Sequence, residues 1–309
     1  MLGARMMRPA LFPLPNVVAG VGWMLASGLS FVVVNGSVRH LGTALPAAEG
    51  AFIRFSFGLL FLMPALVAVL RAGIARALWP LIGLRGALHT LAVSLWFFAM
   101  ARIPLAEVTA IGYLSPIVVT VGAALFLGER LALRRILAIC LALVGTVIVL
   151  RPGLRAITPG HFAQLGAATC FGLSYLAAKR LSSSLPAAAL VALMSATVTL
   201  GLFPFAAANW VAPSHTQVAW LALVALFATM GHYAMARAFA AAPVSVTQPV
   251  TFLQLVWASL LGVFAFGERV DPFVIAGGGL IIAAISYMTW REARIARAGV
   301  TPASGAGTA

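Results

Sequence analysis

The stretch LFLGERLALRR occupies residues 125–135, and a second copy of its core, AFGERV, occupies residues 265–270. The Gly-Glu-Arg triplets begin at Gly128 and Gly267, an offset of 139 residues. The chain has only six carboxylate side chains, and two of them lie in these triplets. A charged motif that recurs at nearly half the chain length, in a very apolar sequence, suggests an internal duplication.

The composition is that of a membrane protein. Of the 309 residues, 62% are hydrophobic and 8% are charged, and the mean hydropathy is +1.06. A soluble domain has roughly a quarter charged residues, so this chain cannot cover a water-facing surface. The net charge of +14 does not indicate a nucleic-acid partner, because the basic residues stand one to three at a time beside apolar runs, as in loops on one side of a bilayer.

Apolar runs divided by charges and Pro/Gly clusters predict an all-α integral membrane protein with ten transmembrane helices. A helix needs about 20 apolar residues to cross a bilayer, and it satisfies its own backbone hydrogen bonds in lipid. The predicted spans are residues 17–37, 47–70, 78–101, 105–127, 134–151, 160–180, 186–208, 217–240, 245–267 and 273–290.

The basic residues predict the orientation of these spans. With both termini in the cytoplasm, fourteen Lys and Arg side chains face inward and five face outward, while Arg54 lies within a span. This bias places both termini on the cytoplasmic side of the membrane. Residues 291–309, which are basic and then small and polar, are expected to form a disordered cytoplasmic tail.

Three further matches support the duplication. GLS occurs at 28–30 and 172–174, LPAA at 45–48 and 185–188, and AMAR at 99–102 and 234–237, with offsets of 144, 140 and 135 residues. Each half, 17–151 and 160–290, then holds five predicted helices, and an odd number inverts the second half relative to the first. Inverted repeats are typical of secondary transporters, whose substrate site lies near the bilayer midplane between the halves, so that access can alternate between the two sides.

The repeated charges allow two interpretations. Glu129 and Arg130, at the end of the fourth span, and Glu268 and Arg269, at the end of the ninth, are either gate charges or helix termini anchored at the water interface. Arg54 lies roughly 10 Å into the second span at about 1.5 Å per residue. Its guanidinium either extends to the interface or contacts a substrate anion.

Two longer stretches resemble a known family. FFAMARIPLAEVTAIGYLSPIVVTVGAALFLGERLALRRILAICLALVGTVIVLRPG, at 97–153, and FLQLVWASLLGVFAFGE, at 252–268, are similar to the EamA domain of the drug/metabolite transporter (DMT) superfamily. The resemblance implies two EamA units in a ten-helix, inverted-repeat carrier, usually one that moves small metabolites or amino acids out of bacteria. The halves differ in that ARAFAAAP replaces ARIP and Gln254 stands where the first half has Ser115.

Polar and aromatic side chains within spans are the candidate substrate-binding residues, because a polar side chain is costly in lipid. Their helical spacing places several of them on shared faces. The candidates are His89, Trp96, Tyr113, Ser115, Tyr175, His232, Tyr233, Gln248, Gln254 and Trp257. For each, a structural role stays open: hydroxyls and histidines bond neighbouring helices, and Trp or Tyr near span ends form interfacial belts.

No Asp or Glu lies in the middle of a predicted span. Proton-driven carriers commonly use such a carboxylate, so either His89 or His232 couples protons or transport is uncoupled. Cys140 and Cys170 are expected to be small core residues, and no metal site or cofactor is predicted.

The aromatic and weakly polar side chains suit an amino acid or a small amphiphilic metabolite rather than an inorganic ion. The prediction is therefore a monomeric exporter in contact with membrane lipids and a small-molecule substrate. A lipid or lipid-precursor flippase is the alternative. An intramembrane enzyme is disfavoured because no converging acid, base or metal set stands in the spans, and a channel because no ring of charge is visible.

Overall fold

The structure is a computed structural model that describes residues 17–127, 133–151, 156–181, 184–241, 250 and 253–298. Within these ranges the chain is helical and contains no strand. The helices are α1 (Val17–Leu41), α2 (Ala47–Ala72), a 3₁₀ turn η1 (Arg76–Leu78), α3 (Trp79–Met100), α4 (Leu105–Gly112), α5 (Ser115–Leu127), α6 (Leu133–Leu150), α7 (Pro159–Leu181), α8 (Ala187–Ala208), α9 (His215–Ala241), α11 (Leu253–Phe266) and α12 (Pro272–Ala298).

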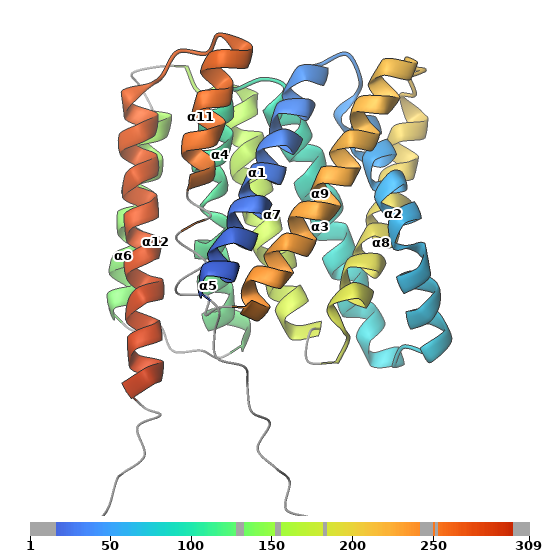
Figure 1. Ribbon diagram of the computed structural model, residues 1–309, viewed down its shortest axis with the longest axis horizontal. Coiled ribbons are helices and arrows are strands. Elements are labelled where there is room, and N and C mark those ends of the chain that lie inside the picture. The colour runs from blue at the N-terminus through green and yellow to red at the C-terminus, as the bar shows by residue number, and fades with distance from the viewer. Residues whose placement is uncertain are drawn as a thin grey trace, which may run out of the picture.

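The long helices lie side by side, and the chain reverses direction from one to the next (Figure 1). As a result α1 and α7 run in opposite directions, and the first described residues lie at the same end of the bundle as the last. Among the described residues, five helices are long and apolar enough to cross a membrane: Val18–Leu41, Ala47–Ala72, Arg76–Met100, Ala188–Ala208 and His215–Met235. Four shorter helices are also apolar, at Leu105–Val119, Ile136–Leu150, Leu253–Phe266 and Pro272–Tyr287.

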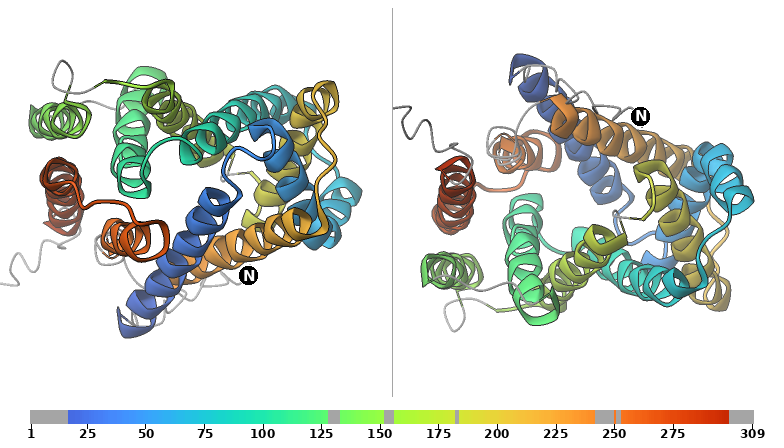
Figure 2. Two further views of the ribbon diagram at one scale, coloured as in Figure 1. Left: turned by 90° about the horizontal axis from the view of Figure 1, so that it is seen from above. Right: turned by 90° about the horizontal axis from the view of Figure 1, so that it is seen from below.

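Helices of the first half pair with helices of the second. The most extensive contacts are α1 with α9, α2 with α8, α3 with α7, and α6 with α12. Seen along the bundle, α6 and α12 lie at one side and α2 and α8 at the other (Figure 2). The α6–α12 pair is close because Gly145 and Gly277 have no side chains, and a Cβ on Gly145 would lie 2.6 Å from the carbonyl oxygen of Gly277.

The predicted fourth span, 105–127, is two helices rather than one. A turn at Tyr113–Leu114 separates α4 from α5. Pro116 lies in the first turn of α5, where its missing N–H is tolerated, whereas inside a continuous helix it would remove a hydrogen bond. The break places the side chain of Tyr113 at a cavity described below.

Two other predicted segments correspond only in part to the described helices. The predicted ninth span, 245–267, is described as helix only for α11, because residues 242–249 and 251–252 lie outside the described residues. Helix α12 continues to Ala298, so residues 291–298 of the predicted disordered tail are helical. Their sequence, REARIARA, is rich in good helix formers, which continue the helix beyond the apolar run.

Candidate functional site

A cavity of about 330 Å³ lies between the two halves of the bundle. Helices α1 to α5 contribute one part of its lining, and α7, α9 and α11 contribute the other. Its polar, charged and aromatic lining residues are Phe31, Asn35, Arg54, Phe55, His89, Trp96, Thr109, Tyr113, Ser115, Gln164, Phe171, Tyr175, His232 and Gln254. Its size and its mixture of aromatic surface with a few polar groups are typical of small-molecule sites.

A second cavity, of about 260 Å³, lies between α2, α8 and α9. Most of its lining is apolar, from residues such as Leu62 and Val191. The two cavities share Arg54, Phe55, His89 and His232, so these four side chains stand where the central and side cavities meet.

Aromatic rings surround His89. Its ring centroid lies 6.0 Å from Phe55, 5.1 Å from Phe171 and 6.4 Å from Tyr175. The rings of Phe171 and Tyr175 are stacked, with an interplanar angle of 12° and a centroid distance of 6.1 Å. They give the cavity a flat wall against which a planar group can stack.

Several polar groups of the lining already have partners. His89 Nδ1 lies 3.2 Å from the Ser174 hydroxyl. The Ser115 hydroxyl donates to the Ala168 carbonyl at 2.9 Å, and Gln164 Nε2 donates to the Val108 carbonyl at 2.8 Å. These bonds join helices, which is the structural role that hydroxyls and amides commonly have in membrane bundles.

Other polar groups have no such partner. The amides of Asn35 and Gln254 line the cavity without a hydrogen bond to another residue in the described segments, and Gln164 Oε1 is buried without one. Because buried polar groups are normally satisfied, these three groups are available to water or to a bound molecule.

Arg54 is the clearest departure from an ordinary apolar core. Its guanidinium lies 4.0 Å from the centroid of the Phe55 ring, and no carboxylate of the described segments pairs with it. Arg54 lies within α2 and not at a helix end, and it lines both cavities.

The structure brings most of the predicted site residues together. His89, Trp96, Tyr113, Ser115, Tyr175, His232 and Gln254 line the central cavity, and Tyr233 lines the side cavity. Trp257, which is 37% exposed, lines neither of these two cavities. Gln248 lies outside the described residues.

Sequence reasoning missed Asn35, Gln164 and Phe171 in the lining. Asn35 and Gln164 each lie inside a predicted span, so the cost of polar groups in lipid was a signal that could have identified them. Phe171 carried no such signal, because a phenylalanine in a membrane helix is equally expected to face lipid.

The second Gly-Glu-Arg copy stands at the end of a helix. Helix α11 ends at Phe266, and Gly267 has a φ of +64°, the left-handed conformation that favours glycine. Glu268 then extends to the other half: its Oε1 lies 3.0 Å from Arg39 Nη2, and its Oε2 accepts from the Leu105 N–H at 3.0 Å. Arg269 is exposed, and Glu129 and Arg130 lie outside the described residues.

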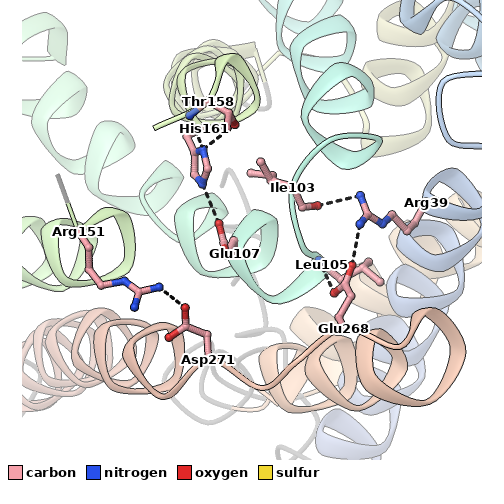
Figure 3. A network of polar contacts seen from close by, with 9 residues as sticks. All are labelled: Arg39, Ile103, Leu105, Glu107, Arg151, Thr158, His161, Glu268 and Asp271. Atoms are coloured by element: carbon pink, nitrogen blue, oxygen red, sulfur yellow. Dashed lines mark hydrogen bonds and ion pairs between the residues drawn. The ribbon is translucent and has the colours of Figure 1, made fainter. Parts of the chain in front are cut away.

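Two further polar pairs lie at the same end of the bundle, the end opposite the described termini (Figures 1 and 3). Arg151 pairs with Asp271, and His161 Nε2 lies 2.8 Å from Glu107 Oε2. We call Arg39, Glu107, Arg151, His161, Glu268 and Asp271 the polar cluster. Each of its pairs joins a residue of the first half to one of the second, so the cluster holds the halves together at this end.

Several known proteins with sequences similar to this chain are transporters. The chain is 26% identical to a riboflavin transporter of Vibrio cholerae over 90% of this chain and 95% of that one. It is 26% identical to an S-adenosylmethionine uptake transporter of Rickettsia bellii, over 88% and 94%, and 28% identical to the pseudopaline exporter CntI of Pseudomonas aeruginosa, over 86% and 94%.

A solved crystal structure has the same fold, with a TM-score of 0.57 at 20% identity, covering 90% of this chain and 98% of the other. Residues 18–151 and 158–290 each match the EamA-like transporter family. These matches confirm the predicted resemblance to the EamA domain. The chain is a multi-pass bacterial membrane protein with two EamA repeats, and it belongs to the EamA-like transporter family of the DMT superfamily.

Proposed function

We propose that this transporter has ten membrane spans in two inverted five-helix halves, residues 17–151 and 160–290, and exports an amino acid or a small amphiphilic metabolite by alternating access. The proposal rests on the central cavity, whose lining comes from both halves. The antiparallel course of α1 and α7 is what an inverted repeat requires.

The polar cluster supports alternating access. It joins the halves at one end of the bundle only, and its charged pairs can separate without breaking a helix. With both termini in the cytoplasm, this end faces outward, and the described conformation is closed to the outside. The protein acts as a monomer in the inner membrane, since one chain supplies both halves of the site.

Flux measurements in proteoliposomes test the function. A panel of amino acids and small aromatic metabolites is offered to the wild-type protein and to His89→Ala, Trp96→Ala and Trp257→Ala variants. We expect at least a tenfold loss of flux for the first two at equal protein abundance, and no change for Trp257→Ala, which lies outside both cavities. If no panel member moves, or if all three variants match the wild type, the central cavity is not the pathway.

Labelling tests the topology. Single cysteines at positions 129 and 268 are expected to react from opposite sides of the membrane. Reaction of both from the same side would exclude inverted repeats.

A lipid or lipid-precursor flippase is the second candidate, favoured by the mostly apolar side cavity between α2, α8 and α9. A flippase would move a fluorescent phospholipid between leaflets of the same proteoliposomes, whereas a metabolite exporter would not.

A further inference from the structure

A positive charge lines the central cavity, and no carboxylate of the described residues balances it. Arg54 lines the cavity from α2. Arg85 lies one turn from His89 on α3 and is buried, with its guanidinium 2.9 Å from the Leu190 carbonyl and 3.4 Å from Met194 Sδ. Neither arginine pairs with a carboxylate in the described part of the chain.

The acidic side chains that the structure describes are engaged elsewhere. Four have described positions: Glu107, Glu268 and Asp271 form the ion pairs of the polar cluster, and Glu49 Oε2 accepts from the Val211 N–H at 3.0 Å. Glu107, Glu268 and Asp271 lie at the end of the bundle that carries the cluster, and Glu49 lies in the first turn of α2, which begins at that end (Figure 1). None of them lines the central or the side cavity.

A guanidinium in a low-dielectric cavity requires a counter-charge or water, because burying an unpaired charge is costly. The planar guanidinium matches a carboxylate with two parallel hydrogen bonds. The stacked rings of Phe171 and Tyr175 and the free amides of Asn35 and Gln254 line the same cavity. This arrangement is complementary to a molecule with a carboxylate, a planar body and further polar substituents.

We infer that the transported substrate is an aromatic organic anion whose carboxylate binds Arg54. This inference rests on the proposed transport function and narrows its substrate class. Among the described residues, the lining of the cavity includes no Asp or Glu to receive an ammonium group. The site therefore prefers a carboxylate without an amine to a zwitterion of the same ring, and it rejects the corresponding amine.

An anionic substrate also accounts for the energy source. Moving one negative charge out of a cell with a negative interior is favoured about 50-fold per 100 mV of membrane potential. Export then needs no proton-coupling carboxylate in the pathway, in agreement with the position of the described acidic residues at one end of the bundle. Over a complete cycle the charge that crosses the membrane is that of the substrate alone.

A matched set of indole compounds tests the inference in proteoliposomes of the full chain: indole-3-acetate, indole-3-acetamide, tryptamine and tryptophan. We expect the wild type to move indole-3-acetate with a KM at least tenfold lower than that of the other three. Arg54→Gln should raise the KM for indole-3-acetate at least tenfold and leave that for indole-3-acetamide unchanged. Arg71→Gln is the matched control, because it removes the same charge from an exposed position on the same helix and should change neither KM.

Membrane potential provides a second measurement that does not depend on the folding of a variant. A potassium gradient with valinomycin sets the potential of wild-type proteoliposomes, and efflux of indole-3-acetate should rise with an inside-negative potential. Efflux of any indole compound of the set that carries no net charge should not change with the membrane potential.

The outcomes separate the inference from the proposed function. If no compound of this set or of the wider metabolite panel moves, the proposed transport function fails. If compounds move without preference for the carboxylate, or if Arg54→Gln weakens carboxylate and carboxamide transport equally, the inference fails while transport stands. If indole-3-acetate flux does not respond to potential, the anion is not moved as a charge and the inference also fails.

Discussion

Replacing Glu268 by Gln should open the end of the bundle that carries the polar cluster. Glu268 contacts both Arg39 and the Leu105 N–H, so one carboxylate of the second half holds two segments of the first half. Arg39 also donates to the Met100 and Ile103 carbonyls, each at 3.1 Å, and these bonds remain in the variant. The substitution therefore removes the negative charge and one acceptor oxygen from the contact between the halves, and it keeps the contacts within the first half.

The magnitude follows from the burial of this pair. The side chains of Arg39 and Glu268 are 21% and 12% exposed, between a surface pair and a buried one. Exposed pairs contribute about 0.2–1 kcal/mol, and loss of one partner of a buried pair costs about 3–5 kcal/mol. We expect about 2 kcal/mol here, which raises the open population about 30-fold, because about 1.4 kcal/mol corresponds to a factor of ten.

Accessibility of a single cysteine measures this change. Val108 is buried, lines the central cavity and follows Glu107 of the polar cluster, so Val108→Cys in a background without Cys140 and Cys170 reports opening at this end. A membrane-impermeant maleimide is added to right-side-out vesicles at low concentration, so that the labelling rate follows the open fraction.

The control for this experiment is Arg102→Gln. Arg102 lies near the same end, but its guanidinium contacts only the carbonyl and ring of Phe98, within its own chain segment. Labelling should be about 30-fold faster in Glu268→Gln and unchanged in Arg102→Gln. Equal labelling rates in Glu268→Gln and the parent protein would refute the idea that this ion pair keeps the end closed.

Three further predictions concern the cavity and the packing. Asn35→Ala and Gln254→Ala should each raise the KM of the transported substrate about tenfold, since a lost hydrogen bond to a charged or polar ligand is worth about 1.5 kcal/mol; flux kinetics at equal protein amount measure this. Ser174→Ala should lower flux less than His89→Ala does, because it removes the 3.2 Å contact that orients the imidazole but leaves the ring in place; the two are compared in one proteoliposome assay. Gly145→Val should lower the thermal stability of the purified protein by about 2 kcal/mol through overpacking against α12, whereas Gly22→Val, with no neighbouring atom within 4 Å, should not.

The helices could largely be predicted from the sequence. The predicted spans 78–101, 134–151 and 186–208 agree with α3, α6 and α8 to within one residue at each end. The agreement is close because charges and prolines flank these apolar runs. Hydropathy could not reveal the break between α4 and α5, since the residues on both sides of the turn are equally apolar. The local signal was Gly112 followed by Pro116, which hydropathy does not register.

The site was predicted less completely, for a geometric reason. Helical periodicity shows which side chains share a face, but it does not show which face points inward. Gln254 and Trp257 are one turn apart, yet Gln254 lines the central cavity and Trp257 does not. Contacts between halves, such as Glu107 with His161, depend on how the helices pack and have no local signal in the sequence.

The polar cluster also makes the two ends of the repeat unequal, and this inequality bears on the transport cycle. At the 139-residue offset of the Gly-Glu-Arg triplets, the position that corresponds to Asp271 is Ala132, and the position that corresponds to Glu107 is Val246. The ion pairs of Asp271 with Arg151 and of Glu107 with His161 therefore cannot recur at the other end. Since the duplication supplies equivalent helices but not these charges, the two ends of the bundle cannot be closed by the same set of contacts, and a transport cycle must exchange one set for another.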